Sequence, residues 1–450
     1  MTTPPSPSET VPKKKASSVR HTRAIQRDRS KRPTVAPPAE QIAERLTEIV
    51  HPATLAQLDY YRQLGLRERI LTLPVMVALV LSLIWRQIGG VCELVRLVGS
   101  EKMLWIPPLK VTQQAVSERL NTFPAELFLR ILTAVLPLMQ RRWQARQRPC
   151  PSAIAWAQAH YPQVWVVDGS TLDALLRKIG LLREARVNPL AGRMMALLEL
   201  GSRLPRQIWY TPDPTTHDQG FWPEILASVQ AGTLLIFDLG YTNFHVFAQL
   251  TTAYVTFVTR AKRNLAYQVI QTFRQTAQVH DHLVWIGVND TRQQVRLIEV
   301  LYRGCWYRYL TNELDPLVFP TDYVVALYWQ RWRIEDAFNI VKRLLGLAYF
   351  WTGSENSVCL QLWATWLLYA VLVDLTDAVA EALDRPFAAL SLEMVYRSLY
   401  YFTQAYHRGE ATDVVVYLAA NAQWLGIIKR KRKTNPSPPK LSPLTVFGEP

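Results

Sequence analysis

Four side chains with complementary chemistry stand at helical spacing near the middle of the C-terminal half of the chain: Tyr328, Arg331, Glu335 and Lys342. On a helix they fall within an arc of roughly 60° and form a row about 21 Å long. Apolar residues gather on the opposite side, so we expect that side to be buried and the row to be presented outward. The row could follow a phosphate backbone beside a metal-binding acid, or it could be an ordinary amphipathic surface helix with ion pairs.

Two aspartates, Asp168 and Asp238, each follow four apolar residues typical of a short strand. Each alone could be a turn or cap residue. Two such strand ends side by side would hold the carboxylates close together, and Glu335 would supply a third. Hard oxygen ligands of this kind suit a pair of Mg²⁺ ions. Asp173 and Asp336 are weaker candidates, because Asp173 lies well past the strand end and Asp336 lies about 100° round the helix from Glu335.

The spacing Tyr328-x2-Arg331-x3-Glu335-x6-Lys342 resembles the Tyr-Arg-Glu-Lys signature of insertion-sequence-four type transposases. These are members of the DDE group, which has an RNase H-like catalytic core. The flanking segments agree with the resemblance, which extends from about residue 75 to 370. The first-acid and second-acid regions of the family are matched by Val166-Val-Asp168-Gly-Ser and by Asp238-Leu-Gly-Tyr241 with Phe257-Val-Thr-Arg260.

The resemblance implies cut-and-paste transposition of DNA. Asp168, Asp238 and Glu335 would bind two Mg²⁺ ions, or Mn²⁺ in their place, and one ion would activate water to nick a strand at the end of the element. The freed 3′-OH would then attack the opposite strand or the target DNA. The implied partners are double-stranded DNA, as terminal inverted repeats and as target, and a second copy of the chain in a synaptic complex.

The resemblance also assigns DNA contacts. Tyr328, Arg331 and Lys342 would grip phosphates near the cut end, Arg331 with two parallel hydrogen bonds and Lys342 as a point charge. Relatives that cut through a DNA hairpin flip a base onto an aromatic residue of a β-rich insertion. Trp306 and Tyr307 are both candidates for that residue, and Tyr307 could equally be a core aromatic.

Two other functions compete with an active transposase. A catalytically inactive DNA-binding derivative could act as an inhibitor or regulator, but all three acids are present. A related RNase H-like nuclease without strand transfer would not be expected to keep the row from Tyr328 to Lys342.

The hydrophobic pattern predicts the elements that must position these residues. We expect an α/β RNase H-like catalytic core with a β-rich insertion, flanked by an α-helical N-terminal domain and C-terminal helices. The predicted divisions are a disordered basic tail (1–38), a helical DNA-binding domain (39–147), a catalytic domain (160–350) with its insertion at about 265–313, a C-terminal helical region (355–425) and a second disordered basic tail (426–450).

Short apolar runs predict the strands, and their order is that of an RNase H-like core with an insertion before its last helix. The expected strands are 164–167, 194–200, 207–210, 234–237 and 254–259, with a helix at about 217–230, and then 283–288, 295–302 and 307–310 in the insertion. In the N-terminal region, a helix at 111–120 begins at a Thr N-cap and exposes Gln113, Gln114, Ser117 and Arg119. It could be a recognition helix of helix-turn-helix type or one hairpin of a plain bundle.

The charge distribution points to a polyanionic partner. The formal net charge of the 450 residues is +15, and residues 1–33 and 426–450 together carry 12 of these excess charges. Mobile basic tails attract polyanions by counterion release, although they could serve solubility alone. Nucleic acid is the favoured partner because the 15 Trp and 19 Tyr offer surfaces on which bases can stack.

The remaining composition indicates a cytoplasmic, nucleoid-associated protein that does not enter a membrane. The four cysteines are widely spaced and suggest neither a zinc knuckle nor a disulfide framework. The eight histidines show no metal-ligand pattern, and we interpret the closest pair, His280 and His282, as surface loop residues. No secretory signal is visible. The apolar runs 70–85 and 360–373 are short for a membrane span and are expected to be core helices.

Overall fold

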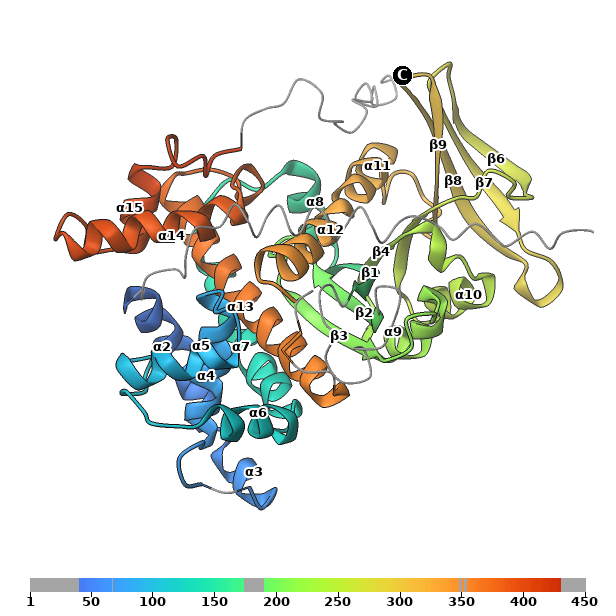
Figure 1. Ribbon diagram of the computed structural model, residues 1–450. Helices are drawn as coiled ribbons and strands as arrows, with labels where there is room; N and C mark the ends of the chain where they lie inside the picture. Colours follow the sequence, from blue (N-terminus) through green and yellow to red (C-terminus); the bar gives the residue numbers. More distant parts are fainter. Residues whose placement is uncertain (1–39, 67, 174–189, 348–349, 352–353, 430–450) are drawn as a thin grey trace, which may run out of the picture.

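The computed structural model describes residues 40–66, 68–173, 190–347, 350–351 and 354–429 (Figure 1). The predicted basic tails, apart from residues 426–429, lie outside the described residues.

One mixed sheet of nine strands runs through the molecule in the order β3-β2-β1-β4-β5-β9-β8-β7-β6 (Figure 1). Its parallel centre consists of β1 (Gln163–Asp173), β4 (Thr233–Phe237) and β5 (Thr256–Arg260). The strands β2 (Leu190–Glu199) and β3 (Pro205–Thr211) continue the sheet antiparallel to β1. All five predicted core strands therefore exist in the predicted order.

The other half of the sheet lies within the predicted insertion. It comprises β6 (Gln268–Gln275), β7 (Val279–Ile286), β8 (Gln293–Tyr302) and β9 (Cys305–Thr311), all antiparallel, and β9 pairs with β5. These strands continue the central sheet outward, at the upper right of Figure 1. The sequence did not predict β6, because most residues of this edge strand are exposed and its apolar residues do not alternate with polar ones.

The central strands are buried on both faces, so the sheet separates two hydrophobic cores. On β1, Val164 and Val166 belong to one core while Trp165 and Val167 belong to the other. β4 is buried at every position, as expected for a parallel strand covered on both sides. This alternation fixes which residues of each strand face which layer of helices.

Short helices cover both faces of the sheet (Figure 1). On one face lie α9 (Trp222–Ser228) and α10 (Phe244–Thr252). On the other lie α8 (Ser152–His160), α11 (Thr321–Gln330) and α12 (Trp332–Asn339). The predicted helix at 217–230 is shorter than expected: a 3-10 turn, Asp218–Phe221, precedes α9, which begins with Pro at its first turn.

Helices from the two ends of the chain pack together at the left of Figure 1. The N-terminal set is α2 (Glu40–Leu55), α3 (Leu58–Gln63), α4 (Leu73–Trp85), α5 (Val91–Ser100), α6 (Gln113–Thr122) and α7 (Glu126–Ala145). The C-terminal set is α13 (Glu355–Ala382), α14 (Leu392–His407) and α15 (Val414–Ala420). A single hydrophobic core runs through both sets and reaches the sheet face that α11 and α12 cover.

The long helix α13 belongs to the interior of this core. By length and composition it is apolar enough to cross a membrane, but 94% of its most apolar window is buried inside the protein. α4 is similarly apolar and is buried along nearly its whole length. The prediction that the apolar runs 70–85 and 360–373 form core helices is therefore confirmed.

The helix α6 begins at the predicted cap: the Thr112 side chain accepts a hydrogen bond from the Ala115 amide at 3.2 Å. Gln113 and Gln114 are exposed, whereas Arg119 donates to the Tyr61 hydroxyl. The amide side chains at the surface are compatible with base contact and with a plain helical hairpin, so both interpretations of this helix stay open.

Two buried aspartates of α13 tie it to the N-terminal helices. Asp374 lies 2.7 Å from Arg146 and 2.9 Å from Arg45, and Asp377 lies 3.0 Å from Arg146. Burial alone would raise the pKa of Asp374, but the nearby Arg146 and Arg45 outweigh it and lower that pKa below its ordinary value.

Replacing Asp374 by Asn is expected to lower the free energy of unfolding at pH 7 by about 2–3 kcal/mol, because the buried carboxylate loses its charge-assisted hydrogen bonds to Arg45 and Arg146. Since the folded-state pKa of Asp374 is lowered, its contribution to stability is present above about pH 3.9 and is lost as the pH falls through the folded-state value. Urea titrations at several pH values measure both effects. Asp59→Ala, which removes an exposed ion pair with Arg62, should change stability by less than about 1 kcal/mol.

Candidate active site

Asp168 and Asp238 lie side by side at the carboxyl end of the parallel strands. The last residues paired between β1 and β4 are Val167 and Phe237, and an aspartate follows each of them. The expectation that Asp168 ends its strand is wrong, because β1 continues to Asp173 by pairing with β2, where Asp168 lies opposite Ala196. Asp168 therefore stands where β4 ends, in the middle of a longer strand.

The segment that carries Tyr328, Arg331, Glu335 and Lys342 is not the single α-helix that the spacing predicted. α11 ends at Gln330, Arg331 joins it to α12 with helical backbone angles, and a π-helix follows at Ile340–Leu344. Lys342 lies in that π-helix and Glu335 in the first turn of α12. Departures of this kind from α-helical geometry occur frequently at functional sites.

Arg331 lies among the three predicted acids. Its Nη1 is 2.7 Å from Oδ2 of Asp168, its Nη2 is 3.1 Å from Oε1 of Glu335, and its Nε is 3.9 Å from Oδ1 of Asp238. The Arg331 side chain is 4% exposed, so this guanidinium faces carboxylates and not solvent. The three predicted acids therefore share one neighbourhood, and a cation lies among them, which the sequence did not predict.

The other members of the row also face the sheet. The hydroxyl of Tyr328, a residue 5% exposed, donates to Oδ1 of Asp238 at 2.9 Å. Lys342 Nζ donates to the Thr171 carbonyl at 2.8 Å and to Ser170 Oγ at 3.2 Å, both on β1. The expectation of an outward-facing row is therefore wrong for Tyr328 and Arg331. Because the end of the parallel strands presents carboxylates, polar side chains can be buried there with partners.

The pKa values of the acids are shifted by burial and by the neighbouring charges. Burial raises the pKa of Asp168 to about 6, even though Arg331 and the Gly169 amide lower it, and Asp218 and Asp238 raise it further. Burial likewise raises the pKa of Glu335 against the effect of Arg331. The same carboxylates raise the pKa of Arg331, outweighing the effect of its burial. Burial of the carboxylates is thus the main cause of the raised pKa values of Asp168 and Glu335.

A further acid, Asp218, belongs to this neighbourhood and was missed by the sequence analysis. It comes from the 3-10 turn before α9, pairs with Arg193 of β2, and acts on the pKa of Asp168. A side-chain atom at Gly169 would collide with a carboxylate oxygen of Asp218, so glycine is what allows the close approach. No strand precedes Asp218, so the sequence held no signal for it. The weaker candidates lie outside the cluster: Asp336 is exposed, and Asp173 stands at the far end of β1.

The two aromatic candidates of the insertion lie on opposite faces of β9, because they are consecutive in a strand. Tyr307 shares its face with Tyr309, whose ring is 5.2 Å from that of Tyr328, and the Arg260 guanidinium lies 5.5 Å from the Tyr307 ring centre. Trp306 is 42% exposed and stacks on His280 instead. Only Tyr307 is thus on the side of the acids.

His280 and His282 are not loop residues, which corrects the sequence interpretation. Both lie in β7, His282 is buried, and they meet Glu299 of β8. Within the described part of the chain, these three form the one group of at least three His, Cys, Asp or Glu side chains whose ligand atoms all lie within 4.8 Å of one another. The four cysteines are free thiols, in agreement with the predicted absence of a disulfide framework.

Comparisons with known proteins agree with the chemistry of the acidic site. Residues 190–370 match the family described as the transposase DDE domain. This range includes Asp238, Glu335 and the row from Tyr328 to Lys342, but not Asp168. A Sinorhizobium fredii (strain NBRC 101917 / NGR234) protein described as "Putative transposase y4zB" is 28% identical over 156 residues, 32% of this chain and 43% of that protein. The matched segment thus spans less than half of the relative's length.

Among solved structures, the chain is similar to the piggyBac transposase in a synaptic complex with hairpin DNA. The identity is 11%, the coverage is 87% of this chain and 84% of that one, and the TM-score is 0.39. A likeness this low carries no argument about function. The matched family and the named relative both carry the description of a transposase.

Proposed function

We propose that this chain is a DNA transposase of the insertion-sequence-four type, with an RNase H-like catalytic core, that cleaves and joins element ends in cut-and-paste transposition. The proposal rests on one observation above all. Asp168, Asp238 and Glu335 come from three separate elements of the fold and converge on one guanidinium. The match of residues 190–370 to a transposase DDE domain supports the same activity.

The donor set fits divalent cations. Three carboxylates with hard oxygen atoms would hold Mg²⁺, or Mn²⁺ in its place. Burial raises the pKa values of Asp168 and Glu335, and a bound cation would offset the cost of keeping these carboxylates ionised there. Ions held by Asp168, Asp238 and Glu335 would supply Lewis-acid activation of water and neutralise charge on the phosphate.

The other residues of the row position the acids and meet the DNA. The Tyr328 hydroxyl orients Asp238, and Lys342 fixes β1 just beyond Asp168. Asp238 and Glu335 are 43% and 40% exposed, so a phosphate can approach the site from their side. The guanidinium of Arg331, whose fork of donors suits phosphate oxygens, would become available to the phosphate once metal ions take the carboxylates that it now contacts. Arg331 would thus neutralise the negative charge of the acids before DNA binds, and that of the scissile phosphate afterwards.

For the aromatic residue that receives a flipped base, the proposal favours Tyr307. It lies on the acid side of β9 beside Arg260, a cation that could hold the neighbouring phosphate. Trp306 lies on the other face, where a base stacked on it would be separated from the acids by the sheet. The proposed partners are terminal inverted repeats and target DNA, bound by a homodimer. The protein would work in the cytoplasm, associated with the nucleoid.

The proposal is tested by incubating the full chain with DNA that carries the inverted repeats flanking its gene, with Mg²⁺ or with EDTA. Metal-dependent cleavage at the repeat boundary followed by joining to target DNA is expected. Specific binding without cleavage would instead identify an inactive regulator. Nicking without joining would identify a nuclease that lacks strand transfer.

The pKa of Asp168 predicts how the affinity for Mg²⁺ depends on pH. Since a proton competes with the metal for this carboxylate and its pKa is about 6, the apparent affinity should be nearly constant above pH 7. Below pH 6 it should fall by about tenfold for each pH unit. Mn²⁺ can serve as the probe, because it favours the same oxygen ligands as Mg²⁺. Its apparent affinity is measured by electron paramagnetic resonance in titrations between pH 5 and 8. An affinity that is the same at pH 5 and pH 8 would contradict the prediction.

A further inference from the structure

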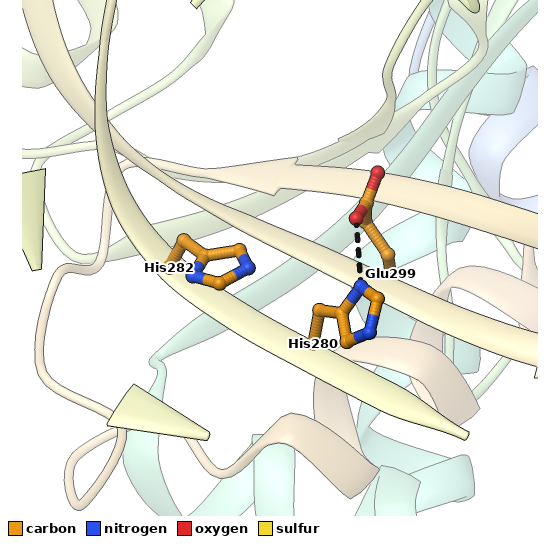
Figure 2. Close-up of side chains that lie close together, drawn as sticks. All are labelled: His280, His282 and Glu299. Carbon is orange, nitrogen blue, oxygen red and sulfur yellow. Dashed lines mark hydrogen bonds and ion pairs between the residues drawn. The ribbon is translucent and has the colours of Figure 1, made fainter. Parts of the chain in front are cut away.

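A second cluster of ligand-type side chains lies in the β6–β9 half of the sheet, apart from the acids. His280 and His282 alternate along β7 and therefore share a face, and Glu299 on β8 is the register partner of His280 (Figure 2). Nδ1 of His280 lies 3.2 Å from Oε2 of Glu299. All three ligand atoms lie within 4.8 Å of one another. The cluster thus joins two neighbouring strands on one face of the sheet.

Each of the three side chains is held by an outer partner. The Thr272 hydroxyl is 3.0 Å from Nδ1 of His282, and Arg308 Nε donates to Oε1 of Glu299 at 2.7 Å. The ring of Trp306 stacks on that of His280 with centres 4.5 Å apart. In the tautomer that donates Nδ1–H to Thr272, His282 carries on Nε2 the lone pair that a metal requires. Oε2 of Glu299 faces His280 while Arg308 holds the other oxygen. Metal sites typically show such outer hydrogen bonds, which orient the ligands.

We propose that His280, His282 and Glu299 form a binding site for a divalent metal ion such as Zn²⁺. Two imidazoles and one carboxylate are a known ligand set for Zn²⁺, with a fourth position left for water or another ligand. Imidazole nitrogen favours Zn²⁺, Co²⁺ or Ni²⁺ over Mg²⁺, so this site and the acidic site would select different ions.

The observed spacing is close to what such an ion needs. Ligands about 2.1 Å from a tetrahedral ion are about 3.4 Å from one another. The His280–Glu299 separation of 3.2 Å already agrees with this value. The wider separations, up to 4.8 Å, must shorten, and the half-exposed ring of His280 can turn to allow it. Burial lowers the pKa of His282, which favours the neutral form that binds metal.

A bound ion would fix one particular surface. It would lock β7 to β8 and hold the His280 ring under Trp306, which is exposed and able to stack on a base or an aromatic group. This face of the sheet is opposite to that of Tyr307. A bound ion would therefore stabilise the surface around Trp306 and would not change the positions of the acids. The proposal does not depend on transposase activity.

The test is a titration of untagged, full-length protein with Co²⁺ and with Zn²⁺ in excess Mg²⁺, followed by the visible ligand-field absorption of Co²⁺ and by calorimetry. One ion per chain is expected. His282→Ala and Glu299→Gln should each abolish saturable binding, and Thr272→Val should weaken it about tenfold, as loss of an outer partner does.

Two control variants separate this site from others. His407→Ala removes an exposed histidine elsewhere, and Asp238→Asn alters the acidic site; both should bind Co²⁺ as the wild type does. Circular dichroism checks that each variant is folded. Binding that survives in Glu299→Gln and His282→Ala, or no saturable binding by the wild type, would overturn the proposal. Neither result would bear on DNA cleavage.

Discussion

Replacing Asp238 by Asn lowers the rate of Mg²⁺-dependent cleavage at the inverted repeats by about 10³-fold or more, if the proposed activity is correct. Asn keeps the size of the side chain, and its carbonyl can still accept the Tyr328 hydroxyl, which now contacts Oδ1 of Asp238 at 2.9 Å. Only the charge and one hard oxygen ligand are lost. Metal ions contribute several kcal/mol of charge stabilisation in the transition state, so a loss of this size is expected. Single-turnover cleavage of labelled DNA ends measures it.

The matched control is Asp336→Asn. Asp336 is exposed on α12 next to Glu335, so the substitution removes an equal charge close to the site without touching the convergent acids. It should retain cleavage within about threefold, as surface substitutions usually do. Binding of the DNA ends should persist in both variants. Cleavage by Asp238→Asn within tenfold of the wild type would remove Asp238 from the catalytic set.

Replacing Arg331 by Met is expected to lower the free energy of unfolding at pH 7 by about 1–2 kcal/mol, because it leaves the largely buried Asp168 carboxylate without its nearest cation, and protonation at a pKa of about 6 limits the cost. Cleavage should also fall by about 100-fold, since the guanidinium is no longer available to the phosphate. Urea unfolding and single-turnover cleavage measure the two effects. Arg331→Lys should recover part of the stability, because it restores a cation. It should not restore the two parallel hydrogen bonds that a guanidinium can donate to a phosphate.

The pH dependence distinguishes this electrostatic explanation from simple loss of packing. The pKa of Asp168 is about 6 in the folded protein and about 3.9 in an unfolded chain, so ionising it disfavours the folded state as the pH rises from about 4 through 6. Without Arg331 that pKa rises further, so the deficit should be smaller at pH 5 than at pH 8. A deficit equal at both values would show that packing alone is responsible.

The matched control for this prediction is Arg333→Met. Arg333 lies two residues away on α12, is partly exposed, and contacts Gln330 instead of the acids. Its loss should change stability by less than about 0.5 kcal/mol at either pH. Mg²⁺ should partly restore the stability of Arg331→Met, because a bound cation replaces the missing charge.

Local sequence information predicted the proximity of the candidate acids and every strand except β6. Asp168 and Asp238 each follow four apolar residues, and parallel neighbouring strands end at the same edge of a sheet, so their proximity could be predicted. The helical period likewise placed Glu335 on the same side as Arg331 and Tyr328. It could not show that this side faces the acids, because periodicity defines the faces of a helix and not what each face meets.

The residues that the sequence analysis missed or misplaced depend on contacts between distant segments. Asp218 reaches Asp168 from a turn that has no strand before it, and only the glycine at position 169 leaves room for it. The predicted strand begins at residue 283, which left His280 and His282 in a loop, whereas β7 begins at Val279. Glu299 joins them through strand register, which sequence spacing does not reveal.

Short-range patterns of apolar and charged residues predicted three candidate acids, the chain order of every strand except β6, and the spacing of the row from Tyr328 to Lys342. Only the tertiary structure decided that Arg331 lies among the acids, that Tyr307 and not Trp306 shares their face of the sheet, and that two histidines meet a glutamate on β8. The reason is physical: burying a charge costs free energy unless a partner is present, and the fold supplies partners from segments far apart in the chain.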